Sequence, residues 1–157
     1  VYDNMKSFVH QFDCQRVIFI TKHLCGNGTD LALRMLINSV KNNLVENYFI
    51  LSPCCHHRCD VHQILGFDYL MELKIDKKYL QYVISHMSGY ASCDSKSKKS
   101  LGKKIKLLID LARVHYLLKH IQNAYLIKYV NRSITVESYA IIFFNHKKLD
   151  MQNFKYY

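Results

Sequence analysis

The stretch VIFITKHLCGNGTDLALRMLINSV, residues 17–40, decides how this chain folds. It starts at 17–21 with β-branched and aromatic residues that predict a buried strand. A polar turn follows, in which Thr29 or Asp30 can cap a helix. Apolar residues then recur at helical spacing over 31–40. The stretch therefore predicts one strand, turn and helix unit of an α/β sheet.

A second strand pattern, residues 48–52, leads into another polar block. Pro53 marks the end of that strand, the block CCHHRC occupies 54–59, and an amphipathic segment follows over 61–70. Both polar blocks thus come directly after a strand. Because the carboxyl ends of parallel strands line the crevice in which ligands bind, we expect a functional site where the two blocks meet.

The second half of the chain predicts a loop, a long helix and two further strands. Residues 93–100 are rich in Ser and Lys without apolar periodicity, which predicts an exposed, mobile loop. Apolar residues on one helical face predict a helix over 101–119. Strands are expected over 124–130 and 136–144, and the short connection between them requires an antiparallel hairpin. The order is βα, βα, α and a closing antiparallel β-hairpin.

Composition indicates a single folded domain over residues 1–157. The chain is 50% hydrophobic and has 12 Tyr, 8 Phe and 1 Pro, which is typical of a packed interior rather than of disorder. No run approaches the roughly 20 apolar residues that span a bilayer, so no membrane partner is expected. Three of the six cysteines bunch within 54–59 and the others are scattered, in a chain large enough not to need disulfides, which argues against a disulfide framework. The composition is interpreted as that of a reduced, intracellular protein, cytoplasmic or nuclear.

The chain is strongly basic. It has 22 Lys and Arg against 12 Asp and Glu, a formal net charge of +10, which favours an anionic partner such as nucleic acid. A bias in genomic base composition also produces many lysines, and composition alone leaves both explanations open. One group of lysines surrounds the start of the predicted long helix, either as a solvated face or as a patch for a nucleic-acid backbone. This group is Lys96, Lys98, Lys99, Lys103, Lys104 and Lys106.

Three separate motifs carry a resemblance to a known family. Residues 22–34, 54–59 and 108–117, in this order, look like the tRNA 2′-O-methyltransferases that modify the fourth nucleotide of the acceptor stem, and the likeness runs over 17–144. The resemblance implies a Rossmann-like methyltransferase fold, of which this chain would be the carboxyl-terminal part, a fragment that need not be active alone. It also implies S-adenosylmethionine as cofactor and tRNA as substrate. Family members carry zinc modules near the amino terminus, so zinc is expected in the parent protein outside this chain.

The chemistry of ribose methylation fits the first polar block. A ribose hydroxyl is a poor nucleophile until its proton is removed or a cation holds its oxygen, and Lys22 and His23 are groups of this kind at a strand end. The resemblance favours a catalytic role for both over the alternatives, a solvated lysine and a histidine bonded to its own loop. Asp30 either caps the following helix or orients a group in the crevice. His56 is expected in the same pocket as Lys22, so the catalytic candidates are Lys22, His23, Asp30 and His56.

The remaining candidates are binding residues. Small residues in a turn let the backbone approach a ligand closely, as the methyl donor requires. A nearby guanidinium is available to a phosphate. On the long helix, Asp110 and Arg113 lie one turn apart and can also form an intrahelical pair of little energetic worth. The cofactor set is Cys25, Gly26, Cys54 and Cys55; the RNA set is His57, Arg58, Lys98, Lys99, Lys103, Lys104 and Arg113.

Two other functions remain open from the residues alone. The Cys and His residues of 54–59, with His62, suit zinc chemically, but structural zinc sites pair two ligands with a second pair well downstream, and only Cys93 and His86 follow. We therefore expect no metal in this chain. The alternative function is a basic Cys/His module that binds RNA or zinc without catalysis. A cysteine hydrolase is disfavoured because nothing identifies an oxyanion hole.

Overall fold

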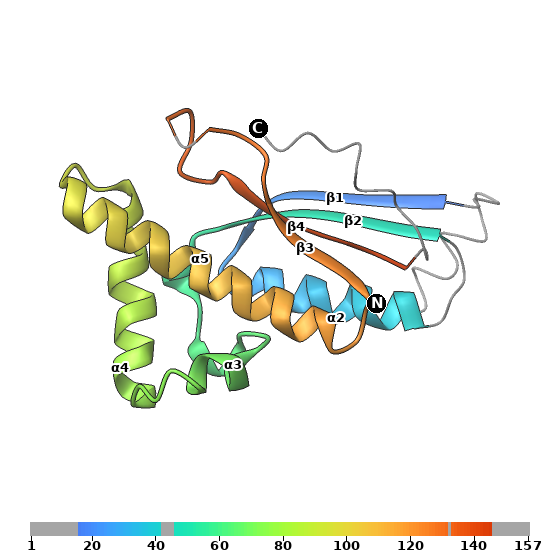
Figure 1. Cartoon of the computed structure of the whole chain (residues 1–157), viewed down its shortest axis with the longest axis horizontal. Helices are drawn as coiled ribbons and strands as arrows, with labels where there is room; N and C mark the ends of the chain where they lie inside the picture. The colour runs from blue at the N-terminus through green and yellow to red at the C-terminus, as the bar shows by residue number, and fades with distance from the viewer. Residues whose placement is uncertain (1–15, 42–45, 132, 146–157) are drawn as a thin grey trace.

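A computed structural model describes residues 16–41, 46–131 and 133–145 of the chain. They form a mixed α/β domain in which helices stack against a four-stranded sheet (Figure 1). The predicted strands and long helices are present, with shifted ends. The elements are β1 (Arg16–Cys25), α2 (Gly28–Lys41), β2 (Glu46–Cys54), η1 (His56–Arg58), η2 (Val61–Gln63), α3 (Phe67–Met71), α4 (Lys77–Tyr82), η3 (Val83–Met87), η4 (Ser88–Ser92), α5 (Lys96–Leu118), β3 (Asn123–Lys128) and β4 (Tyr139–Phe144).

The strands lie in the order β1-β2-β4-β3. β1 and β2 run parallel, whereas β4 pairs antiparallel with both β2 and β3, with Phe143 opposite Phe49. The parallel pair and the closing hairpin predicted from the sequence are therefore confirmed. Because β1 and β2 run in the same direction, they end at the same edge of the sheet, where Cys25 lies opposite Cys54.

α2 and α5 cover one face of the sheet. Phe49 and Phe143 on that face are fully buried and stack with ring centroids 4.4 Å apart. Leu33 of α2 and Leu117 of α5 pack into the same cluster. Burying one such side chain stabilises the fold by roughly 1.5–3 kcal/mol. A second buried cluster joins α4 and η3 to α5, so α5 is held between the sheet and the small helices.

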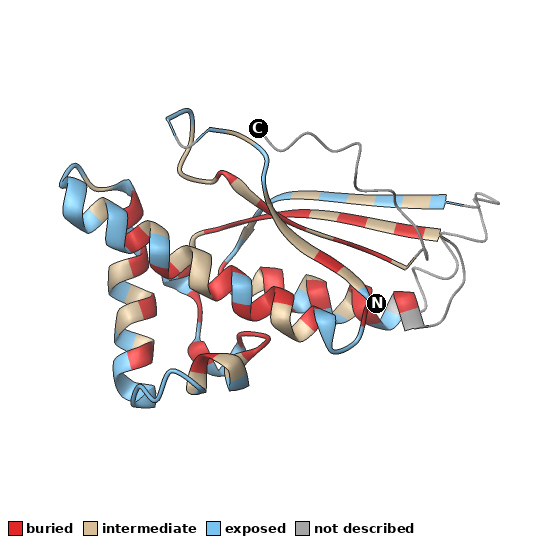
Figure 2. Cartoon of the chain, viewed as in Figure 1, coloured by how far each residue is buried: buried red, intermediate tan, exposed pale blue. Residues whose placement is uncertain are grey.

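The opposite face of the sheet is more open at β1. Figure 2 shows exposed positions along this strand, and Ile18 and Ile20 are 62% and 72% exposed. Within the described ranges β1 pairs on one side only, with β2. Side chains this exposed keep most of their apolar surface in water, so they contribute little to the stability of the described fold.

Two segments differ from the sequence-based expectation. Residues 96–100 form the first turns of α5, not part of an exposed loop over 93–100. Their side chains are largely exposed, but a helix that extends from a packed segment needs no buried face in its first turns, and lysine is a good helix former. The amphipathic segment 61–70 divides into the turn η2 and the short helix α3, because Gly66 has a left-handed φ of 80° between them.

α5 approaches η4 very closely at Gly102. A Cβ atom added to this glycine would lie 2.1 Å from the backbone nitrogen of Ala91 and 2.6 Å from the carbonyl carbon of Tyr90. No side chain fits in that space, so glycine is required for the contact. The close approach fixes the amino-terminal half of α5, which carries the lysines, relative to the small helices.

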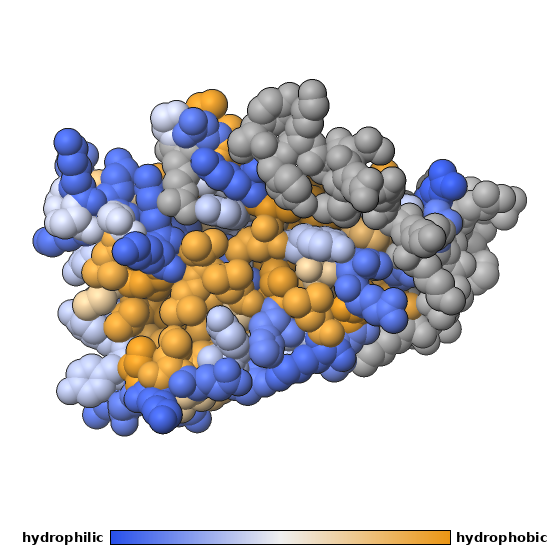
Figure 3. Space-filling model, in the orientation of Figure 1, coloured by the Kyte–Doolittle hydropathy of each residue, from blue (hydrophilic) through white to orange (hydrophobic). Residues whose placement is uncertain are grey.

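The surface of α5 changes character along its length. Figure 3 shows apolar side chains over the middle of the helix and hydrophilic side chains at its amino-terminal end. Leu111 and Leu118 are 39% and 53% exposed. The end that carries the lysine group is therefore mainly hydrophilic, with Leu101, which is 41% exposed, among the lysines. None of the helices in the described ranges is long and apolar enough to cross a membrane.

Candidate active site

The carboxyl end of β1 contains an irregularity. Lys22 pairs with Ser52 and Leu24 pairs with Pro53, so His23 is an extra residue in the ladder. His23 has a left-handed φ of 66°, which is uncommon for a residue with a side chain. Bulges of this kind bend a strand and redirect its side chains. The irregularity leaves Lys22 and His23 both exposed at the strand end.

β2 ends in a second unusual turn. Cys55 has a left-handed φ of 47° and leads directly into η1. Such conformations cost of order 1–3 kcal/mol and cluster at functional sites. Beside this turn lies Gly26, the first residue after β1, whose backbone nitrogen donates to the carbonyl of Cys54 at 3.3 Å. A Cβ atom on Gly26 would lie 3.0 Å from the carbonyl oxygen of Arg58, so the two strand ends are in close backbone contact.

Three cysteine thiols meet where the two strands end. The sulfurs of Cys25 and Cys54 are 3.2 Å apart, and the sulfur of Cys55 joins them in a group whose members all lie within 4.8 Å of one another. Burial raises the pKa of Cys54 to about 12, and the hydrogen bond to Cys25 adds to this. Hydrogen bonds from Cys54 and Cys55 lower the pKa of the exposed Cys25 thiol. The sulfurs thus interact mainly with one another.

A buried ion-pair network lies beneath the strand ends. Arg113 of α5 has no exposed surface and holds Asp30 of α2 through two hydrogen bonds of 2.7 and 3.1 Å. The same guanidinium donates to Asp110 at 3.0 Å and to the carbonyl of Gly26 at 3.2 Å. Asp110 in turn bonds Nε2 of the buried His56 at 2.8 Å. Arg113 therefore joins α2, α5 and the turn after β1, and through Asp110 and His56 the network also reaches η1 after β2.

The charges of this network shift the pKa values of its members. Burial alone would raise the pKa of Asp110, but His56 and Arg113 outweigh burial and hold that pKa below its ordinary value. Burial opposes the charge of Arg113, yet Asp30 and Asp110 outweigh it and raise the pKa of the guanidinium. Burial raises the pKa of the neighbouring Cys59 thiol to about 11. Near neutral pH, Arg113 and Asp110 are therefore charged, and Cys59 is a neutral thiol.

A small pocket adjoins His56. Its lining includes Pro53, Lys103 and Asp110. Its volume is about 20 Å³, which is room for about one water molecule, whereas ligand pockets usually have roughly 300–1,000 Å³. Among the described residues, Nδ1 of His56 has no hydrogen-bond partner. A water-sized molecule fits beside His56 in this pocket, but a nucleoside does not.

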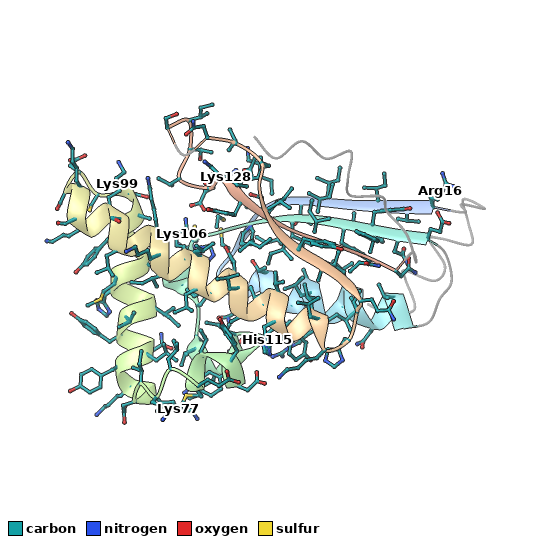
Figure 4. The ribbon with its side chains drawn as sticks, viewed as in Figure 1. Arg16, Lys77, Lys99, Lys106, His115 and Lys128 are labelled. Carbon is teal, nitrogen blue, oxygen red and sulfur yellow. The ribbon has the colours of Figure 1, made fainter. Side chains whose placement is uncertain are left out.

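α5 carries the predicted RNA-contacting lysines along its amino-terminal half. Figure 4 places Lys99 near the amino-terminal end of α5 and Lys106 further along the helix, closer to the sheet. Lys106 forms an ion pair with Glu137, so part of its charge is neutralised. The four lysines predicted to contact RNA all keep exposed surface; they are Lys98, Lys99, Lys103 and Lys104.

The structure divides the predicted site residues into an exposed group and a buried group. At the strand ends, β1 and β2 bring together residues that the sequence separates by about 30 positions. Gly26 and Cys54 are buried beneath them and supply mainly backbone to the edge. The surface members of this edge are Lys22, His23, Cys25, Cys55, His57 and Arg58.

The buried group contains Asp30, His56 and Arg113, which are 1%, 2% and 0% exposed. Asp30 reaches inward and accepts a hydrogen bond from the backbone nitrogen of Leu65 at 2.9 Å, in addition to those from Arg113. An RNA phosphate has no access to a guanidinium without exposed surface. The structure therefore does not support the prediction that Arg113 contacts RNA, and it places Arg113 in the interior of the site instead.

Asp110 has a second partner besides the one that helical spacing predicts. The spacing predicts a pair with Arg113 on the same helix, and that pair is present at 3.0 Å. Its partnership with His56, 54 positions earlier in the chain, was not predicted. A signal existed, because Asp110 and Arg113 are the only acidic and basic charges besides His115 in the apolar stretch 107–118. Opposite charges inside an otherwise apolar helix segment indicate a buried pair.

Comparison with known proteins supports the resemblance seen in the motifs. The sequence model of the family described as Methyltransferase TRM13 matches residues 3–100 and 92–144. The chain belongs to the TRM13 methyltransferase family. The matched ranges contain both strand ends, the Cys/His block and α5, so every TRM13-like motif identified in the sequence falls inside them.

Several curated members of the TRM13 family are similar to this chain. The tRNA:m(4)X modification enzyme TRM13 of Scheffersomyces stipitis is 27% identical, over 88% of this chain and 39% of that protein. Its counterpart in Kluyveromyces lactis is 25% identical, over 83% and 36%. The TRM13 homolog of Homo sapiens is 28% identical, over 49% and 24%. The chain thus spans about two fifths or less of the length of these relatives. No solved structure matches the chain.

Proposed function

We propose that this chain forms the acceptor side of an S-adenosylmethionine-dependent enzyme that methylates a ribose 2′-hydroxyl in the acceptor stem of tRNA. Membership of the TRM13 methyltransferase family supports methyl transfer to tRNA. The observation that carries the site assignment is the pair of left-handed residues, His23 and Cys55, at the carboxyl ends of the two parallel strands. Ligand crevices of open α/β sheets lie at this edge.

The proposal includes a Rossmann-like methyltransferase fold. The strand order β1-β2-β4-β3, with two parallel strands followed by an antiparallel hairpin, is the arrangement expected for the carboxyl-terminal half of that fold. α2 follows the end of β1 directly, as a strand, turn and helix unit requires. This arrangement places the two polar blocks side by side at one edge.

Lys22 carries the chemistry in this proposal. Its ammonium group is exposed at the strand end, next to the bulge, where a ribose hydroxyl can approach it from solvent. A cation at this point stabilises the negative charge that develops on the hydroxyl oxygen, and a neighbouring base removes the proton. His23 is the neighbouring base, exposed beside Lys22. S-adenosylmethionine, when bound, supplies the methyl group.

Cys25, Gly26, Cys54 and Cys55 form one wall of the cofactor pocket in this proposal. Gly26 presents bare backbone, which lets a ligand approach closely. The thiols are turned toward one another, so the wall offers mainly backbone atoms together with the exposed edge of Cys25. These residues suit one side of a cofactor pocket.

The remaining candidates position the site or bind tRNA. Asp30, His56 and Arg113 are positioning residues, because they are buried and act through the strand ends that they hold. tRNA phosphates contact the exposed His57 and Arg58 at the edge, together with the lysines of α5. Those lysines are Lys98, Lys99, Lys103 and Lys104.

The decisive test replaces Lys22 by alanine in the full-length protein. We expect single-turnover methyl transfer to tRNA to fall by roughly 100-fold or more, the usual scale for losing a general acid–base group. Thermal stability and tRNA affinity should change little, because Lys22 is exposed. Lys78→Ala, which removes an exposed lysine on α4, is the matched control. Near-normal turnover of Lys22→Ala would remove Lys22 from the reaction, whereas an unaltered protein that binds tRNA but transfers no methyl group would favour a binding module without catalysis.

A further inference from the structure

The three thiols at the strand ends lie closer together than a single hydrogen bond between two of them requires. Cys25 and Cys54 come from different strands and are opposite each other in the parallel register. Cys55 adopts a left-handed φ of 47° directly after β2, and its sulfur lies with the other two inside 4.8 Å. A strained backbone conformation is kept only where the surrounding structure holds it in place. At Cys55 this conformation brings a third sulfur next to those of Cys25 and Cys54.

The spacing of the sulfurs is close to that of a thiolate metal site. With a zinc–sulfur bond of about 2.3 Å, two sulfurs of one ion lie roughly 3.8–4.0 Å apart in tetrahedral or trigonal geometry. The Cys25 and Cys54 sulfurs are 3.2 Å apart and the group as a whole stays within 4.8 Å. A shift of less than about 1 Å, within the reach of side-chain rotation, therefore converts the cluster into a ligand set.

Access and charge also suit an ion. Cys54 is buried, Cys55 is partly buried and Cys25 is exposed, so an ion can enter from the Cys25 side and keep a fourth position open to water. Soft thiolate ligands select zinc and other thiophilic ions over magnesium or calcium. Three thiolates around a divalent ion leave one net negative charge. Arg58 lowers the pKa of Cys25 and Glu137 raises it, and the effect of Arg58 is the larger of the two. The positive charge of Arg58 therefore offsets the net negative charge of the site.

We propose that Cys25, Cys54 and Cys55 bind one thiophilic divalent ion, zinc in the first instance, with water as the fourth ligand. The ion displaces the three thiol protons to solvent and forms three metal–sulfur bonds, with no change in oxidation state. The bound ion links the ends of β1 and β2 at the edge of the sheet that carries Lys22. Sequence spacing predicts no metal because it offers no second pair of ligands downstream of 54–59. In the folded sheet the additional ligand, Cys25, comes from upstream instead. The inference is independent of methyl transfer.

The test is a cobalt(II) titration of the purified 157-residue chain, kept reduced with a phosphine that does not chelate metals. We expect one ion per chain, with the thiolate-to-cobalt charge-transfer absorption of three sulfur ligands, and displacement of cobalt by zinc. Cys25→Ser should weaken binding by at least about 100-fold, because loss of a direct ligand exceeds the 10–100-fold effect of outer partners. Cys25 is exposed, so this variant should keep its circular dichroism spectrum.

Cys93→Ser is the matched control, since Cys93 is a partly exposed thiol outside the cluster. Its cobalt affinity should equal that of the unaltered chain. Equal affinity of Cys25→Ser and Cys93→Ser would overturn the proposal, and so would a cobalt complex that lacks the charge-transfer band. A Cys25–Cys54 disulfide that forms in air, in a chain that binds no cobalt after reduction, would overturn it in favour of a simple thiol pair.

Discussion

Replacing Arg113 by methionine should destabilise the chain severely. The guanidinium holds Asp30 with two bonds of 2.7 and 3.1 Å and Asp110 with one of 3.0 Å, and all three side chains are almost fully buried. Methionine fills much of the volume but leaves two carboxylates without their cation. Breaking a buried ion pair in this way costs about 3–5 kcal/mol. Single domains have only about 5–15 kcal/mol of stability, so about a fifth or more of the total is at stake.

Urea unfolding of the purified chain measures this loss. With a slope of about 2 kcal/mol per molar urea, a loss of about 4 kcal/mol lowers the unfolding midpoint by roughly 2 M. Arg34→Met is the matched control, because Arg34 is exposed and makes a single 3.3 Å bond to the carbonyl of Gln63. Surface changes of that kind stay within about 0.5 kcal/mol.

A double-mutant cycle tests the mechanism. Adding Asp30→Asn to Arg113→Met removes one of the uncompensated charges while keeping an oxygen for the backbone nitrogen of Leu65. It should therefore recover about 1 kcal/mol or more, within the range of coupling energies between residues in contact. If Arg113→Met costs less than about 1 kcal/mol, or if Asp30→Asn makes it worse, the network does not stabilise the fold as its geometry indicates.

The pKa of Asp110 lies below the ordinary 3.8 in the folded chain, so its stabilising contribution is complete above pH about 4 and is lost as the pH falls through the folded value. Urea midpoints measured from pH 6 to pH 2 should fall less steeply in Asp110→Asn, and an unchanged slope would contradict this. Gly102→Ala should cost about 1–3 kcal/mol or more, because its Cβ would lie 2.1 Å from the nitrogen of Ala91, whereas Gly28→Ala, with no atom within 4 Å, should be nearly neutral; equal melting temperatures would refute this. Changing four lysines to glutamine should weaken tRNA binding by the full-length protein and flatten its salt dependence, and an unchanged slope would make these lysines a solvated face. The four are Lys98, Lys99, Lys103 and Lys104.

Local periodicity predicted most of the fold. The β-branched run at 17–21 and the run at 48–52 became β1 and β2, and the short connection between 124–130 and 136–144 correctly required an antiparallel hairpin. The start of α5 was missed because its first turns have no buried face, so residues 96–100 show none of the apolar spacing on which such predictions depend.

The candidate site was predicted less completely, because its contacts are long-range. Placing the two polar blocks at one edge followed from the parallel pairing of two strands, which the sequence does indicate. The His56–Asp110 and Arg113–Asp30 bonds join residues 54 and 83 positions apart, and no local pattern encodes them. They depend on how α5 crosses beneath the strand ends, which only the packing determines.

Residues of one sequence motif differ in how far they are buried, and burial separates the groups that can react from those that position the site. Lys22 and Asp30 both belong to the same TRM13-like motif, but Lys22 faces solvent and Asp30 is 1% exposed and bound to Arg113. Loss of Asp30 must therefore act first on the fold, since it leaves Arg113 buried without its main partner. Loss of Lys22 removes a charge from the edge and leaves the interior intact. A decrease in activity that comes without a decrease in stability is consequently the property that distinguishes a reacting group from a positioning one in this site.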